Sequence, residues 1–122
     1  MDRSHRGQLG YLAGAAAEDI VARAYEERGC PTAERRWRGQ GGEIDLIVRD
    51  GELVIFVEVK KSTNFAQAAT RLSRRQMDRI CKAACEFVGG EPRGMLTDMR
   101  FDVAMVDGQG AVQIIPNAFG GA

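Results

Sequence analysis

The chain has 122 residues, and its 17 Lys and Arg are balanced by 17 Asp and Glu, so its length fits one domain over residues 1–122. The balanced charge gives no global positive field to indicate nucleic-acid binding, and only local clusters can argue for it. No stretch approaches the ~20 apolar residues of a membrane span and no secretory signal opens the chain, so we expect a cytoplasmic protein that binds no membrane.

The N-terminal part of the chain is expected to form a helix followed by a short strand. Residues 1–9 are polar, and we expect them to be flexible. Apolar residues recur with helical periodicity from Leu9 to about Gly29, which is expected to stop the helix. A strand over Thr32 to Arg38 leads into a glycine-rich run at residues 39–42. Neither Lys-Ser/Thr nor a helix follows this run, so we interpret it as a flexible connection and not as a phosphate-binding loop.

A β-hairpin with two apolar arms is expected over residues 42–60. The Asp50-Gly51 pair between the arms supplies the chemistry of a tight turn. Because side chains alternate along a strand, charged residues two positions apart in one arm share a face. These residues are Glu43 and Asp45 in the first arm, and Glu58 and Lys60 in the second arm.

The register of this hairpin depends on its turn. With Asp50-Gly51 as the two loop residues, Glu43 lies opposite Glu58. Asp45 then lies opposite Phe56, and all the acidic side chains of the two arms point to one side of the hairpin. A longer or bulged loop would shift this pairing, so the expected geometry is conditional on the turn.

Three carboxylates on an otherwise apolar hairpin need a compensating partner. Like charges across a ladder destabilise it, and carboxylates removed from water are costly unless they are paired, coordinated or protonated. A Mg²⁺ ion would satisfy them, because it takes oxygen ligands and is often held by one or two carboxylates. Lys60 would then lie beside the metal. The alternative is a solvated acidic face on which Lys60 makes an ordinary ion pair.

Asp45 followed by Glu58-Val59-Lys60 resembles the D…(D/E)-x-K signature of the PD-(D/E)xK, or restriction-endonuclease-like, nucleases. More narrowly, the segments at 42–47 and 54–60 resemble the small bacterial proteins of the YraN or UPF0102 family. The likeness continues at residues 14–18 and 100–103, and so covers about residues 10–115 of the chain. The resemblance implies a nuclease site more firmly than it implies a particular substrate.

The expected order of elements is α-β-β-β-α-β-β, which gives an α/β fold with a mixed central sheet flanked by helices. The resemblance implies the same fold, as a restriction-endonuclease-like core with the site at one edge of the sheet. It also implies that the first helix delivers Glu18 to the acidic cluster, although Asp19 is an equally acidic neighbour. The implied catalytic residues are Glu18, Asp45, Glu58 and Lys60, and the implied ligands of Mg²⁺ or Mn²⁺ are Asp45, Glu58 and Glu43.

A second helix is expected over about Ser73 to Val88, with Ser73 as N-cap and Gln76 three residues on. Its basic residues recur at steps of four and three, and Arg35, Arg36 and Arg38 add charge before the glycine run. Such a stripe could follow a phosphodiester backbone, or it could simply keep a surface helix soluble. The candidate nucleic-acid contacts are Arg38, Lys61, Arg71, Arg74, Arg75 and Arg79.

The last two strands are expected near Arg100 to Val106 and Ala111 to Ile115. An exposed edge from these strands could pair in a homodimer, and residues 117–122 are expected to be flexible. The three cysteines lack a C-x-x-C pair and matching histidines, so we interpret Cys30, Cys81 and Cys85 as buried free thiols. Trp37 could stack on an unpaired base, but we favour core packing.

The functional hypothesis is a Mg²⁺- or Mn²⁺-dependent endonuclease acting on DNA, with repair or recombination as its setting. The metal would polarise the scissile phosphate and lower the pKa of a bound water, and Lys60 would orient that water or neutralise developing charge. One alternative is a nucleic-acid-binding or adaptor domain that keeps the fold but no longer cuts. Another is a structural interaction domain in which Lys60 pairs with Glu58 or Asp45.

Overall fold

The computed structural model describes residues 16–61 and 72–119, and within them five strands form one sheet in the order β1-β2-β3-β4-β5. Neighbouring strands are antiparallel except β3 and β4, which are parallel. The mixed α/β sheet and the order of its elements confirm the prediction from the sequence. The strands are β1 (Thr32–Arg38), β2 (Glu43–Asp50), β3 (Leu53–Lys61), β4 (Met99–Val106) and β5 (Val112–Ile115).

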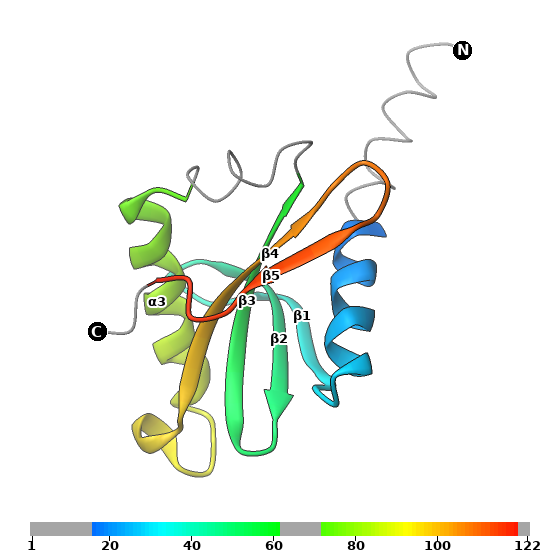
Figure 1. Ribbon diagram of the computed structural model, residues 1–122. Coiled ribbons are helices and arrows are strands. Elements are labelled where there is room, and N and C mark those ends of the chain that lie inside the picture. Colours follow the sequence, from blue (N-terminus) through cyan, green and yellow to red (C-terminus); the bar gives the residue numbers. More distant parts are fainter. Residues whose placement is uncertain (1–15, 62–71, 120–122) are drawn as a thin grey trace.

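One helix covers each face of this sheet, so the described residues form three layers (Figure 1). The first helix, which includes residues 16–27, lies on one face, and α3 (Arg74–Val88) lies on the other. A short 3₁₀ helix, η1 (Gly94–Leu96), precedes β4. Neither helix, within the residues described, has the length and apolar character needed to cross a membrane.

Alternation along β3 divides the core between the two helices. Ile55 and Val57 point to the first helix, whereas Val54 and Phe56 point to α3. All four side chains are almost completely inaccessible to solvent. Because β3 is central and covered on both faces, its sequence is a continuous apolar run and not an alternating one. This central strand carries Glu58 and Lys60 beyond its buried part.

The helix ends agree with the local signals in the sequence. Gly29 adopts φ 82°, and the Cys30 N–H donates to the Tyr25 carbonyl at 2.9 Å, which confirms the predicted stop. At α3, the Ser73 side chain accepts from the Gln76 N–H, and the Gln76 side chain accepts from the Ser73 N–H, which confirms the capping box. The predicted start of the first helix near Leu9 lies outside the described residues.

The predicted hairpin register is wrong. Asp50 pairs with Leu53, and Ile47 pairs with Phe56, so the loop consists of Gly51 and Glu52. Gly51 has φ 61°, and a glycine at the first loop position is what a type II′ turn requires. The pairings of Asp45 with Phe56 and of Glu43 with Glu58 therefore do not form.

A buried polar network ties the first helix to β4. The Asp102 carboxylate accepts from the Tyr25 hydroxyl at 2.7 Å and from Arg100 Nε and Nη2 at 2.8 and 3.0 Å. It also accepts from the Asn117 backbone N–H at 3.1 Å. Asp102 is only 1% exposed, and a buried carboxylate is tolerated when it is paired and hydrogen-bonded in this way.

The residues that follow β5 also pack on the sheet. The Ala118 N–H donates to the Phe101 carbonyl at 2.7 Å, and the flexibility expected for residues 117–122 stays a prediction. The Phe119 ring stacks on Phe101 with centroids 5.1 Å apart. Residues 1–9 and 120–122 lie outside the described residues. The partly buried Phe119 ring thus packs against β4.

Trp37 belongs to the core, as favoured from the sequence. Its ring meets Phe87 of α3 edge-on, with centroids 5.5 Å apart. Of the cysteines, Cys30 is buried, and burial raises the pKa of its thiol. The prediction is wrong for Cys85, which is exposed, and Cys81 is half-buried. The difference follows from the helix face: α3 buries Ala84 and Val88 against the sheet, and Cys85 points elsewhere.

Candidate active site

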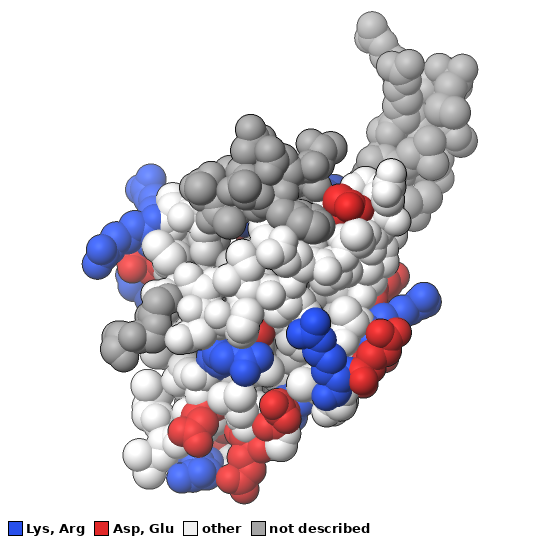
Figure 2. Space-filling view, in the orientation of Figure 1, with Lys and Arg blue, Asp and Glu red and all other residues white. Residues whose placement is uncertain are grey.

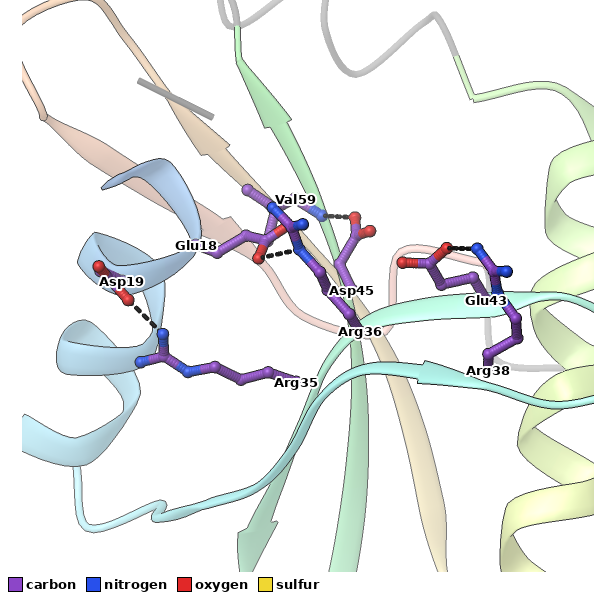
Figure 3. Close-up of polar contacts among 8 residues, drawn as sticks. All are labelled: Glu18, Asp19, Arg35, Arg36, Arg38, Glu43, Asp45 and Val59. Carbon is purple, nitrogen blue, oxygen red and sulfur yellow. Dashed lines mark hydrogen bonds and ion pairs between the residues drawn. The ribbon is translucent and has the colours of Figure 1, made fainter. Parts of the chain in front are cut away.

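Asp45 lies at the point where β2 and β3 separate. The two strands pair from Asp50 opposite Leu53 as far as Leu46 opposite Val57. Beyond this point the Asp45 carboxylate accepts a hydrogen bond from the Val59 N–H at 2.9 Å (Figure 3). This hydrogen bond to the backbone of β3 holds the Asp45 carboxylate beside Glu58 and Lys60 of that strand.

Glu58 and Lys60 lie next to Asp45. The carboxyl group of Glu58, when protonated, shares a side-chain hydrogen bond with Asp45. Lys60 Nζ lies 3.6 Å from Glu58 Oε1, and the two side chains are 22% and 17% exposed. The structure therefore brings together three of the residues predicted to form the catalytic centre, despite the different hairpin register.

Burial sets the protonation of this pair of carboxyl groups. Burial, together with the charge of Asp45, raises the pKa of Glu58 to about 7, and the neighbouring Lys60 opposes the shift. Burial also raises the pKa of Asp45, against the hydrogen bond from Val59. The two groups consequently retain a proton at pH values where an exposed carboxylate has lost it.

Glu43 faces a cleft between the sheet and α3. The cleft has a volume of about 180 Å³ and is lined by Gly42, Glu43, Glu58, Gln76, Arg79 and Ile80. The Glu43 carboxylate pairs with Arg38 Nη2 at 3.2 Å. Its charge also contributes to the raised pKa of Asp45. Glu43 is thus near Asp45 and Glu58, but its carboxylate forms an ion pair with Arg38.

Glu18 approaches from the first helix. Arg36 Nε donates to both carboxylate oxygens of Glu18, at 3.0 and 3.3 Å. The charge of Glu18 raises the pKa of Asp45, so the two groups interact across the layer between helix and sheet. The neighbouring acid, Asp19, instead pairs with Arg35 (Figure 3). The structure therefore brings Glu18, and not Asp19, toward Asp45.

The acidic side chains of this site offer oxygen ligands to a metal ion, but they do not form a complete coordination sphere. Among residues 16–61 and 72–119, no three side chains of His, Cys, Asp or Glu group closely enough to hold a metal ion. The interacting pair is Asp45 and Glu58, whereas Glu43 is held by Arg38. The donor set fits Mg²⁺ or Mn²⁺, because these ions accept one or two carboxylates and keep several water ligands.

The basic residues predicted to contact nucleic acid are distributed around this site. Arg79 lines the cleft, whereas Arg74 and Arg75 are exposed in the first turn of α3. Lys61 is exposed at the end of β3, and Arg71 lies outside the described residues. Figure 2 shows blue side chains over the upper end of α3, with acidic residues close to them. Acidic and basic groups alternate elsewhere on that face, so no continuous positive surface appears there.

The glycine run before β2 is fixed, which corrects the prediction of a flexible connection. The backbone N–H groups of Gln40 and Gly41 both donate to the Glu86 carboxylate at 3.0 Å. A Cβ atom at Gly39 would lie 2.5 Å from Glu86 Oε2. The glycines therefore allow close approach to α3, and Glu86, which the sequence did not single out, anchors the loop next to Glu43. No local signal identifies Glu86, because its partners lie more than 40 residues away in the chain.

Comparison with known proteins identifies a family. Residues 17–106 match the family described as "Uncharacterised protein family UPF0102". A UPF0102 protein of Cereibacter sphaeroides is 65% identical over 113 residues, which cover 93% of this chain and 97% of that protein. A UPF0102 protein of Ruegeria pomeroyi is 58% identical over 94% of both chains, and one of Dinoroseobacter shibae is 48% identical over 94% of this chain and 86% of its own.

Proposed function

The chain belongs to the UPF0102 family, and we propose that it is a Mg²⁺- or Mn²⁺-dependent endonuclease that hydrolyses phosphodiester bonds in DNA. One observation carries the proposal: two partly buried carboxyl groups, Asp45 and Glu58, interact directly, with Lys60 3.6 Å from Glu58. Buried acidic pairs with perturbed pKa values are typical of catalytic sites. The order of Asp45, Glu58 and Lys60 in the chain also resembles the nuclease signature.

Each residue of this group would have a distinct role. Asp45 is held by the Val59 N–H, so its carboxylate is preorganised to bind a cation together with Glu58. Glu58 would release its proton when a cation occupies the site. Lys60 would orient a water or stabilise negative charge on the phosphate. A bound divalent cation would supply polarisation of a phosphate oxygen and a water of lowered pKa.

The cleft beside Glu58 supports a phosphodiester substrate. Arg79 lines it from α3, and arginine suits bidentate phosphate contact. Arg74 and Arg75 extend the basic character along the exposed side of the same helix. We place the activity in the cytoplasm, in repair or recombination, with a homodimer through the β5 edge as the form that would cut both strands of a duplex.

A second candidate is a nucleic-acid-binding domain that does not cut. Two observations favour it: Lys60 pairs with Glu58, and the described residues include no group of three metal-binding side chains. An ion pair of this kind can be purely structural. This candidate predicts binding that needs no divalent cation and never yields products.

The test is a cleavage assay on duplex, single-stranded, flap and junction DNA and on RNA, with Mg²⁺ or Mn²⁺. The variants are Asp45→Asn and Lys60→Ala, and the matched control is Asp19→Asn, which removes an acid of the first helix that pairs with Arg35. We expect Asp45→Asn and Lys60→Ala to lose at least about a hundredfold in rate. The control should keep the wild-type rate. Wild-type cleavage by Asp45→Asn would contradict the proposal.

A further inference from the structure

Two consecutive arginines of β1 reach the same helix. Arg35 pairs with Asp19, and Arg36 pairs with Glu18. In a regular strand, successive side chains point to opposite faces of the sheet. Arg36 departs from the regular conformation with φ 49°, in the left-handed region. This single backbone position is what turns a second arginine to the first helix.

The irregular backbone at Arg36 of β1 lies opposite Asp45 of β2. Arg35 pairs with Leu46, and Trp37 pairs with Ile44, so Arg36 lies opposite Asp45 in the ladder. On β2, Ile44 belongs to the same core cluster as Ile47, three residues on, so alternation is also interrupted around Asp45. Figure 3 shows the result: the Arg36 and Glu18 side chains meet beside the bond between Asp45 and Val59. The Arg35 and Asp19 pair lies apart from it.

The backbone conformation of Arg36 is unusual for its residue type. A residue other than glycine is strained in the left-handed region, and Asn or Asp tolerate it better than Arg. The neighbouring Arg35 and Asp19 pair already links β1 to the first helix. Backbone strain at a residue other than glycine is characteristic of functional positions.

We propose that Arg36 is a phosphate-binding residue of this site, whose guanidinium passes from Glu18 to a phosphodiester oxygen when nucleic acid binds. The inference rests on the proposed function, because that function supplies the phosphodiester ligand. The Arg36 side chain is 46% exposed, so a ligand can reach it, whereas Glu18 is only 16% exposed. Glu18 would hold the guanidinium beside the site until the substrate arrives.

Charge explains why such a residue is needed. The site gathers four acids, and a phosphodiester that approaches them is repelled unless cations compensate. Lys60 pairs with Glu58, and Arg38 pairs with Glu43. Arg36 brings a further cation, opposite Asp45, and its planar fork matches phosphate oxygens. The four acids are Glu18, Glu43, Asp45 and Glu58.

The test compares Arg36→Asn with Arg35→Asn, its neighbour in the same strand. Fluorescence anisotropy measures the Kd for labelled single-stranded and duplex oligonucleotides, in EDTA and in Ca²⁺, over a range of salt concentrations. We expect Arg36→Asn to weaken binding about tenfold and to reduce the salt slope by about one unit. Because Asn tolerates the left-handed region, its Tm should equal or exceed that of the wild type. Arg35→Asn should change binding by less than about twofold.

A double variant distinguishes direct contact between Arg36 and phosphate from repulsion of phosphate by a Glu18 carboxylate that has lost its arginine. If Arg36 binds phosphate, adding Glu18→Gln to Arg36→Asn leaves binding weak; if binding returns to the wild-type level, the inference is overturned. Equal binding by the Arg36→Asn and Arg35→Asn variants also overturns it, as does a wild-type chain that binds neither oligonucleotide. Failure of the nuclease proposal gives a different result. The Asp45→Asn variant would then cleave DNA at the wild-type rate, while the Arg36→Asn and Arg35→Asn variants would still differ in their Kd for the oligonucleotides.

Discussion

Glu58 is a site residue whose protonation is changed strongly by the fold. In the folded chain its pKa is raised to about 7 by burial and by Asp45, against the influence of Lys60. Glu43 and Arg79 are the further charged residues that line the adjoining cleft. The folded chain therefore binds more protons than the unfolded chain between the ordinary glutamate pKa of 4.5 and about 7. Stability decreases as pH rises through this window.

Replacement of Glu58 by Gln removes this titration. We expect wild-type stability to fall by about 2–3 kcal/mol between pH 4.5 and pH 7.5, and the Glu58→Gln variant to lose much less over the same range. The measurement is the free energy of unfolding by urea at several pH values. An equal pH dependence in the two proteins would show that Glu58 titrates normally in the folded state. Glu52→Gln is the matched control, because the Glu52 side chain is 87% exposed and lies in the hairpin loop, at the other end of β2 and β3 from Asp45.

Cation binding at the same pair should compete with protons. Asp45 and Glu58 must both be ionised to bind Mn²⁺, and the raised pKa of each makes this harder below about pH 7. We expect the affinity for Mn²⁺, measured by calorimetry, to fall by up to about tenfold per pH unit below pH 7. Asp45→Asn should abolish this binding. Affinity that does not vary between pH 5.5 and pH 7.5 would place the ion elsewhere.

At the scale of elements, the contact between the glycine loop and α3 positions Glu43 in the cleft. The Glu86 carboxylate binds the loop backbone, and the Gly39 N–H donates to the Gly42 carbonyl at 2.9 Å. The loop thus acts as a rigid connection between β1 and β2. Glu43 follows it directly and lines the cleft. A change in the glycine loop should therefore alter both the position of Glu43 in the site and the packing of α3.

Gly39→Ala tests this contact. The added Cβ would lie 2.5 Å from Glu86 Oε2 and 2.8 Å from Trp37 Cη2, so the carboxylate or the ring must move. We expect a loss of about 1–3 kcal/mol in the free energy of unfolding. Gly108→Ala is the control, because a Cβ there meets nothing within 4 Å. Equal stability of the two variants would mean that the loop adapts without cost.

At the scale of the whole molecule, Asp102 joins parts that are distant in the chain. Its carboxylate connects Tyr25 of the first helix, Arg100 of β4 and the Asn117 backbone after β5. Burial and the bond to Asp102 raise the pKa of Tyr25, so the phenol remains a neutral donor. The helix that carries Glu18 is thus fixed to the sheet by a hydrogen bond as well as by apolar contacts.

Tyr25→Phe removes one donor from Asp102 with little change in side-chain volume. We expect a loss of about 1–3 kcal/mol, because the buried carboxylate keeps its charge and loses a partner. Thermal unfolding followed by circular dichroism would measure it. Leu96→Ala, at a side chain that is 76% exposed, is the control and should change stability by less than about 0.5 kcal/mol. A Tyr25→Phe protein as stable as the wild type would show that the network does not hold the layers together.

Local sequence was sufficient for most elements and for part of the site. The capping box of Ser73 and Gln76, the stop at Gly29 and the apolar run of β3 all act within a few residues of the chain. The proximity of Asp45, Glu58 and Lys60 also followed from a single hairpin, because neighbouring strands bring such residues together in any nearby register. The predicted register was wrong, since Gly51 fits the second loop position of a type I′ turn and also the first loop position of a type II′ turn.

The sequence by itself determined the family, the α/β class and the segment that holds the acidic pair, because each depends on residue types at short spacing. Only the tertiary structure decided that Asp19 pairs with Arg35, that Glu86 fixes the glycine loop, and that Arg36 turns to Glu18. These contacts join residues that are between 16 and 46 positions apart, as in Arg35 with Asp19 and Gln40 with Glu86. Packing of both helices on the twisted sheet, and not local propensity, brings such residues into contact.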